Sequence, residues 1–311
     1  MKPISLAAPL AAIGGRRNRS IHVWRFALAG LIVAGLAFQF WRSDTRALAV
    51  LQAPSPGPLA LAALMGTASY FLFLEAWRRL RGLREAWQKL GSVWFASLFA
   101  RYAPGGLWQG AVRVGGAHVA GESKRIALER YLAEQALACF SATTLALALF
   151  PFANLPAGAP LLGMLAAVAT AALAAAIVGP RLGIALHWSL SAVFSMLGGH
   201  LLMALGFAAM IAALAGTISA ADAASYMVMF LAAGVAGLLV VFVPAGIGVR
   251  EAVLAGLLAP GFGVAPAIAI ALAARVWLLA CEAAAFGLWW LATRRRPIRS
   301  PDAPAAGGRR W

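Results

Sequence analysis

Residues 194–216 read FSMLGGHLLMALGFAAMIAALAG, an apolar run without a single Asp, Glu, Lys or Arg. Crossing the roughly 30 Å hydrocarbon core of a bilayer takes about 20 helical residues, and a helix satisfies its own backbone hydrogen bonds there. The run therefore predicts a membrane-spanning helix. Five further runs predict full spans in the same way: 24–41, 58–77, 129–150, 160–178 and 266–291.

The composition of the whole chain favours the same class. Its 311 residues are 62% hydrophobic and 12% charged, with a mean hydropathy of +0.83. A water-soluble domain cannot cover that much apolar surface, so the excess faces lipid. The net charge is +16, and the basic residues gather at the ends of apolar runs. This placement favours cytoplasmic loops and anionic lipid headgroups over nucleic acid as their partners.

Two apolar stretches do not fit a simple span. Residues 90–116 are interrupted by RYAPGG at 101–106, and residues 225–263 by PAGIG at 244–248. Proline removes a backbone donor and glycine permits non-helical dihedrals, so each interruption is expected to break its helix.

Charge placement predicts how the broken stretches run, because basic loops stay in the cytoplasm. Basic residues precede and follow the first stretch, so both of its ends are expected on the cytoplasmic face. The basic run 294–296 makes the last span begin outside, so the second stretch starts and ends on the external face. Each is predicted to be a re-entrant hairpin. The alternative is eight simple spans with ordinary loops.

The predicted order is span, span, hairpin, span in residues 24–150, and the same again in 160–292. The first half starts inside and the second outside. Such inverted repeats with broken helices recur in secondary transporters, where the breaks meet near the bilayer midplane and form the substrate site. We expect one all-α polytopic membrane domain over residues 21–296, with cytoplasmic tails at 1–20 and 297–311.

The first break is a candidate anion site. A half-helix that starts after Pro104, Gly105 and Gly106 would present free N–H groups and its positive dipole end to a phosphate. Arg101 and Arg113 would add charge-assisted hydrogen bonds. The alternative is an interfacial loop whose arginines reach bulk headgroups.

The second break contains Pro244, Gly246 and Gly248 and is followed by Arg250 and Glu251. A glutamate in the first turn complements the helix dipole, whereas an arginine there has no such structural reason. Ionisable side chains at membrane depth are costly and usually functional. We therefore expect Arg250 to face protein or a water-filled cavity and to bind an anionic group.

The spans that follow the two hairpins carry further ionisable residues. Arg275 joins the predicted substrate-binding arginines, and three glutamates are candidates for charge balance or proton coupling: Glu129, Glu134 and Glu282. Glu129 lies near the cytoplasmic boundary, where a solvated ion pair is an equal alternative.

Other residue types suggest less chemistry. His200 is the one histidine inside a firm span, and we expect it to be a packing hydrogen-bonder rather than a proton carrier. Cys139 and Cys281 lie in apolar segments. Their placement predicts no disulfide, and the sequence indicates no metal or other cofactor.

Three motifs carry a resemblance to a known family: YAPGGLW at 102–108, ALERYLAE at 127–134 and PAGIGVRE at 244–251. With the span pattern, the chain resembles the lysylphosphatidylglycerol synthase transmembrane-region family of flippase-like membrane proteins over nearly its whole length. Ala245 stands where glycine is more usual, and Glu134 where aspartate is common.

The resemblance implies a bacterial inner-membrane protein that moves or binds a phospholipid or a related isoprenoid or glycolipid. Two-part members carry a soluble aminoacyl-transferase domain after the membrane region. We expect aminoacylation to be absent here, since only a short tail follows Arg296.

The leading hypothesis is a translocase for a lipid with an anionic headgroup. One alternative is a non-transporting membrane partner that presents lipid to a glycosyltransferase or lipid-modifying enzyme. An intramembrane enzyme is less favoured, because the sequence has no nucleophile and base set, no metal-ligand spacing and no nucleotide-binding loop.

Overall fold

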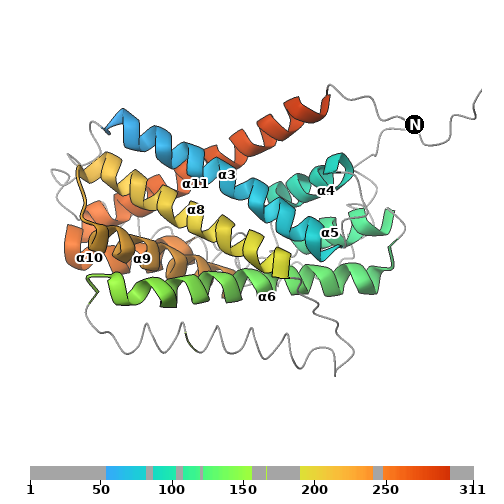
Figure 1. Ribbon diagram of the computed structural model, residues 1–311, viewed down its shortest axis with the longest axis horizontal. Coiled ribbons are helices and arrows are strands. Elements are labelled where there is room, and N and C mark those ends of the chain that lie inside the picture. The colour runs from blue at the N-terminus through green and yellow to red at the C-terminus, as the bar shows by residue number, and fades with distance from the viewer. Residues whose placement is uncertain are drawn as a thin grey trace, which may run out of the picture.

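The computed structural model describes residues 54–81, 87–102, 108–119, 122–155, 166, 190–240 and 248–294. Within these ranges the regular elements are helices (Figure 1). They are α3 (Pro56–Leu80), α4 (Trp87–Ala100), α5 (Trp108–Val119), α6 (Lys124–Leu149), the 3-10 turn η2 (Phe150–Phe152), α8 (Leu190–Ala215), α9 (Ala220–Leu239), α10 (Val249–Phe262) and α11 (Val264–Arg294). Five of them, α3, α6, α8, α9 and α11, are long and apolar enough to cross a membrane. The predicted class, an all-α polytopic membrane protein, is confirmed.

Four of the predicted full spans correspond to α3, α6, α8 and α11, and each helix begins a few residues before its predicted start. The first turn of α6 shows why: it contains Lys124 and Arg125, and Ser123 caps it by accepting a hydrogen bond from the Ile126 N–H. Capping and polar first turns extend a helix beyond the stretch that hydropathy detects. The predicted spans at 24–41 and 160–178 lie outside the described residues.

Both helix breaks occur where the sequence predicts them. α4 ends at Ala100 and α5 begins at Trp108, while α9 ends at Leu239 and α10 begins at Val249. Gly248 is the N-cap of α10 and has a φ of +89°, which residues with a side chain rarely adopt. Pro104, Gly105, Gly106, Pro244 and Gly246 lie outside the described residues.

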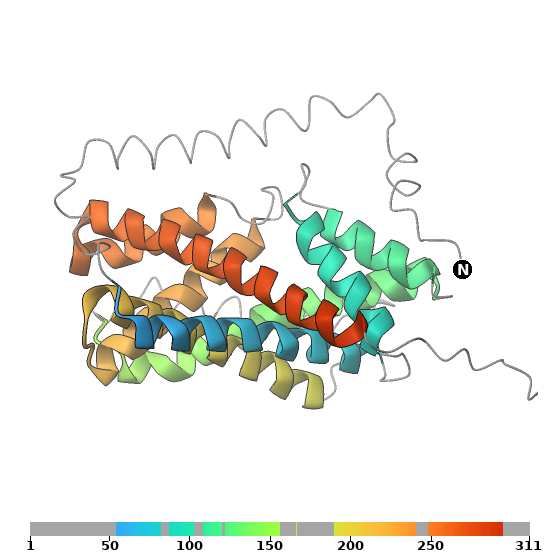
Figure 2. The same cartoon turned by 90° about the horizontal axis from the view of Figure 1, so that it is seen from above.

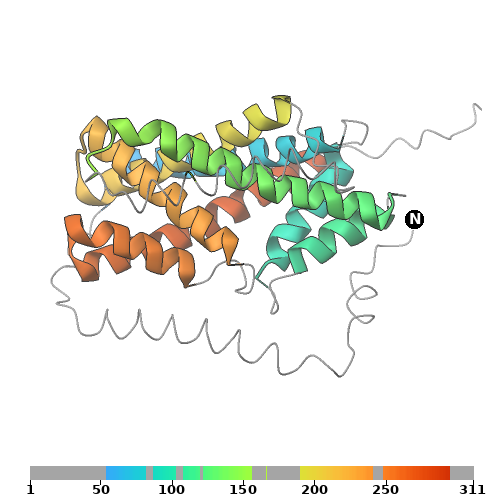
Figure 3. The same ribbon diagram turned by 90° about the horizontal axis from the view of Figure 1, so that it is seen from below.

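The arms of each broken segment lie side by side. Figures 2 and 3 show α4 running from one end of the molecule to its middle and α5 returning, while α9 and α10 do the same from the opposite end. Tyr226 and Phe262 pack at the open end of the second pair, with ring centroids 5.7 Å apart. At its tip, a Cβ on Gly237 would lie 3.1 Å from the Cβ of Arg250. The described arms therefore form two hairpins that point toward each other.

The described helices follow one order twice, in opposite directions. α3, the hairpin α4/α5 and α6 form one set, and α8, the hairpin α9/α10 and α11 form the other (Figure 1). The antiparallel relation is visible where Ser55 N–H, at the start of α3, donates to Ala213 O, at the end of α8, over 2.8 Å. The central buried core contains Phe207 and Phe230, whose rings stack at 4.6 Å, together with Trp277.

Small residues let α3 and α8 approach closely. A Cβ on Gly206 would lie 3.2 Å from Ala62 O and 3.3 Å from Gly66 N, both backbone atoms, and 2.9 Å from the Trp277 ring. Close packing of this kind is a main stabilising contact between membrane helices, because lipid provides no hydrophobic force between them.

Gly206→Ala is therefore expected to destabilise the protein by about 1–3 kcal/mol, the usual cost of overpacking. Thermal unfolding in detergent measures the change. Gly287→Ala is the matched control, because a Cβ at Gly287 in α11 meets nothing within 4 Å. An unfolding midpoint for Gly206→Ala as high as that of the control would contradict the close approach.

Candidate functional site

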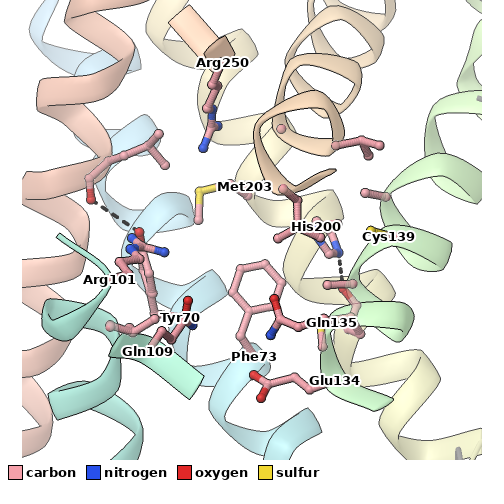
Figure 4. A pocket seen from close by; sticks show the side chains of 18 of the residues that line it. Tyr70, Phe73, Arg101, Gln109, Glu134, Gln135, Cys139, His200, Met203 and Arg250 are labelled. Carbon is pink, nitrogen blue, oxygen red and sulfur yellow. Dashed lines mark hydrogen bonds between the residues drawn. The ribbon is translucent and has the colours of Figure 1, made fainter. Parts of the chain in front are cut away.

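A cavity of about 220 Å³ lies between the two hairpin tips, with α3, α6, α8 and α11 around it (Figure 4). Most of its lining is apolar, but polar side chains from both hairpins and from the surrounding helices also contribute. They are Tyr70, Arg101, Tyr102, Gln109, Arg113, Glu134, Gln135, His200, Arg250 and Arg275. Arg101 and Arg250, which flank the two predicted breaks, therefore line the same cavity.

Arg101 joins the tip of the first hairpin to α11. Its Nη2 lies 2.5 Å from Oε2 of Glu282, and the Tyr102 hydroxyl donates to the same oxygen over 2.9 Å. Glu282 is only 1% exposed. A carboxylate buried so deeply needs a charged partner and hydrogen bonds, and these two side chains of the first break supply them.

Arg275 joins the second hairpin to the same helix. Its Nη1 lies 3.5 Å from Oε1 of Glu251, and Oε2 of Glu251 accepts the Gly248 N–H over 2.7 Å. Glu251 therefore caps the N-terminus of α10 and also compensates the positive charge of Arg275. The Arg275 guanidinium also lies 5.3 Å from the centre of the Tyr102 ring, which belongs to the other hairpin. One turn of α11 therefore contacts both tips.

Arg113 and Glu134 form the third ion pair, between α5 and α6. Nη1 of Arg113 lies 2.5 Å from Oε2 of Glu134, and its Nε donates to the Ser97 hydroxyl at 2.5 Å. The guanidinium also lies 4.5 Å from the centre of the Trp77 ring and 5.5 Å from that of Trp94. Arg113 is 2% exposed, so this pair fixes the first hairpin against its neighbours.

Arg250 differs from the other three arginines. Its guanidinium lies 4.5 Å over the Phe230 ring, and within the described ranges it has no ion pair and no hydrogen bond. Figure 4 shows it extending from α10 into the cavity. The site thus combines four arginines with three glutamates, and each glutamate already has an arginine. Among the described residues, the positive charge of Arg250 therefore has no acidic partner, in a place where a lone charge is costly.

Glu129 does not join this group. It lies 2.9 Å from Arg125, whose side chain is 75% exposed, and it does not line the cavity. This is the solvated pair that the sequence left open as an alternative. Arg275 and Glu282 both lie in α11, but each pairs with a residue from a hairpin instead of with the other.

The neutral polar side chains of the cavity were not predicted as site residues: Gln109, Gln135 and Tyr102. His200, which also lines the cavity, was expected to have only a packing role. A carboxamide within a long apolar helix is a usable signal, because an amide in hydrocarbon is unfavourable without a partner. Gln135 in α6 meets that description.

The chemistry of the lining favours binding an anion. Guanidinium groups bind phosphate and carboxylate through paired hydrogen bonds, and within the described ranges the Arg250 guanidinium makes no other hydrogen bond. Nowhere in the described part of the chain do three or more His, Cys, Asp or Glu residues group as metal ligands would. Cys139 and Cys281 are buried and not joined to each other.

Comparison with known proteins gives no indication of function. No protein-family model, curated protein or solved structure matches this chain.

Proposed function

We propose that this protein is a translocase that moves a lipid with an anionic headgroup, a phospholipid or an isoprenoid or glycolipid, across the bacterial inner membrane. The observation that carries the proposal is the guanidinium of Arg250, which faces the cavity without an acidic partner among the described residues. An entering phosphate would supply the missing negative charge.

The size of the cavity supports a headgroup as the ligand. About 220 Å³ accommodates a headgroup but not two acyl chains. The chains would stay in the surrounding bilayer while the polar group passes between the hairpins. Exclusion of bulk water would strengthen the contact between phosphate and guanidinium, since charges attract more strongly at low dielectric constant.

The opposed hairpins support movement rather than binding alone. In transporters built from inverted repeats, the substrate site alternates between the two membrane faces as one part rocks against the other. Here the two tips contact each other mainly through α11, by way of Glu282 and Arg275. Exchange of these ion pairs would open the cavity toward one face and close it toward the other.

The charged residues at the two ends of the helix bundle support one orientation of the protein in the membrane. Arg78, Arg79, Lys124 and Arg125 gather where α3 ends and α6 begins, whereas Asp222 lies at the opposite end beside Asn154. Under the positive-inside rule the basic end would face the cytoplasm. The resemblance of the three sequence motifs to flippase-like proteins supports the same function.

Reconstitution into liposomes tests the proposal. Vesicles would contain a trace of phospholipid with a fluorophore on an acyl chain, either anionic phosphatidylglycerol or zwitterionic phosphatidylcholine. Dithionite quenches only the outer leaflet unless lipid crosses the bilayer. We expect the protein to make the inner-leaflet anionic lipid accessible, and to act more slowly on the zwitterionic one.

Two other results would reject translocation. Binding of anionic lipid without movement would favour the non-transporting partner that presents lipid to another enzyme. A lipid extract with altered chemical composition after incubation would indicate an enzyme.

A further inference from the structure

Tyr102 lies at the tip of the first hairpin, directly after Arg101, and its hydroxyl belongs to the ion pair of that tip. The hydroxyl accepts a hydrogen bond from Nη2 of Arg101 over 3.0 Å and donates one to Oε2 of Glu282 over 2.9 Å. Within the described ranges, Oε1 of Glu282 and Nε of Arg101 are buried without a hydrogen-bond partner. Because a buried carboxylate depends on the few donors that reach it, the Tyr102 hydroxyl is a main support of Glu282.

The ring of Tyr102 contacts a second ion pair. The guanidinium carbon of Arg275 lies 5.3 Å from the ring centre, within the range of a cation–π contact. The carboxylate partner of Arg275 is Glu251, which belongs to α10 of the second hairpin and lies 3.5 Å away. This distance is longer than the 2.5 Å between Arg101 and Glu282. Arg275 is therefore shared between a carboxylate of one hairpin and an aromatic ring of the other.

These contacts make both ion pairs depend on one side chain. We infer that Tyr102 is the positioning residue that couples the two hairpins, with its hydroxyl on Glu282 and its ring on Arg275. Withdrawal of the first tip removes the ring from Arg275, which then pairs more closely with Glu251. Movement of α10 away from Arg275 leaves that guanidinium to the ring of Tyr102 and holds the first tip in place.

The coupling has a purpose in a translocase, and in this respect the inference rests on the proposed function. Alternating access requires that the site open toward one membrane face at a time. Because a shift of either tip changes the contacts of the other, Tyr102 keeps the two hairpins from releasing the cavity together.

A double-mutant cycle measures the coupling. Tyr102→Leu removes the ring, and Glu251→Gln removes the charge but keeps an oxygen that can accept the Gly248 N–H. Each single variant leaves Arg275 with one of these two partners, whereas the double variant removes both. In mixed micelles, we expect the change in the unfolding equilibrium constant of the double variant to exceed the product of the two single changes by at least about twofold. A change equal to that product would overturn the inference.

Two further cycles separate the ring from the hydroxyl and from a general loss of packing. Tyr102→Phe keeps the ring, so its effect on the unfolding equilibrium constant should multiply with that of Glu251→Gln. Tyr131→Leu is the matched control, because Tyr131 packs against the same hairpin: a Cβ on Gly110 of α5 would lie 2.9 Å from its ring. Its effect should also multiply with that of Glu251→Gln. Coupling of the same size in either cycle would show a diffuse packing effect and reject the specific role of Tyr102.

Spin labels measure the positions of the hairpins directly. Ala111 in α5 and Leu239 at the end of α9 are exposed, whereas the native Cys139 and Cys281 are buried. With labels on Ala111→Cys and Leu239→Cys, double electron–electron resonance is expected to give a broader distance distribution when Tyr102→Leu is added. An unchanged distribution would mean that Tyr102 does not set the positions of the tips.

The inference and the proposed function can fail separately. Neither the unfolding cycles nor the spin-label distances require lipid to move, so a wild type that moves no lipid rejects translocation but not the coupling. Lipid movement by the wild type, with multiplicative cycles and an unchanged distance distribution, rejects the coupling alone.

Discussion

Arg250→Ala is expected to reduce transport of anionic lipid by at least about tenfold, since a hydrogen bond to a charged group contributes about 1.5–3 kcal/mol. The same substitution is expected to leave the unfolding midpoint unchanged or slightly raised. Arg250 has no acidic partner in the described part of the chain, so its removal leaves no carboxylate uncompensated and relieves the cost of a lone buried charge. Dithionite assays and thermal unfolding of the same preparation measure the two quantities.

Two control variants test whether the effect is specific to the guanidinium of Arg250. Arg250→Lys keeps the charge but loses the planar, paired hydrogen bonds, so intermediate transport is expected. Arg125→Ala removes an exposed arginine of the basic end and should leave transport unchanged. Normal transport by Arg250→Ala would reject the proposed site, and parallel loss of transport and stability would show that Arg250 is structural.

The helix breaks and the position of Arg250 in the first turn of a half-helix were predictable from local sequence. Proline and glycine act on the backbone where they stand, and an arginine in the first turn of an apolar half-helix has no structural reason to be there. The placement of charges in the loops predicted that the two hairpins enter from opposite faces of the membrane. These features depend on neighbours in sequence, so one sequence sufficed.

The pairing of charges could not be predicted in the same way. Arg101 and Glu282 are 181 residues apart, and their contact depends on where the tip of the first hairpin meets α11. Helical periodicity gives the face of a helix that a residue occupies, but not the helix that packs against it. Arg275 and Glu282 lie in the same helix, α11, yet their partners, Glu251 and Arg101, come from different hairpins.

The neutral lining was harder still to predict. Gln109 and Gln135 carry no charge, and position along a predicted span does not separate a side chain that faces lipid from one that faces a cavity. Only the packing of α5, α6 and α8 around the same space brings them together with His200. The chemical character of the cavity, beyond its charged groups, depends on that packing.

Glu282→Gln is expected to destabilise the protein by about 3–5 kcal/mol, the cost of breaking a buried ion pair from one side. The substitution leaves the Arg101 guanidinium without its carboxylate, and Tyr102 without its charged acceptor. Removing both charges in Arg101→Met/Glu282→Gln is expected to restore most of the loss, because the remaining groups are neutral. Reversible unfolding in mixed micelles measures the free energies of unfolding of the wild type, the single variant and the double variant. Glu129→Gln at the exposed Arg125 pair is a control whose free energy of unfolding should change by less than about 1 kcal/mol.

If the double variant were as unstable as the single one, packing of the side chains rather than their charge would hold the first hairpin against α11. Recovery of stability together with loss of transport would instead show that this pair serves the movement of the hairpins, since a purely structural contact would not be needed once the fold is restored.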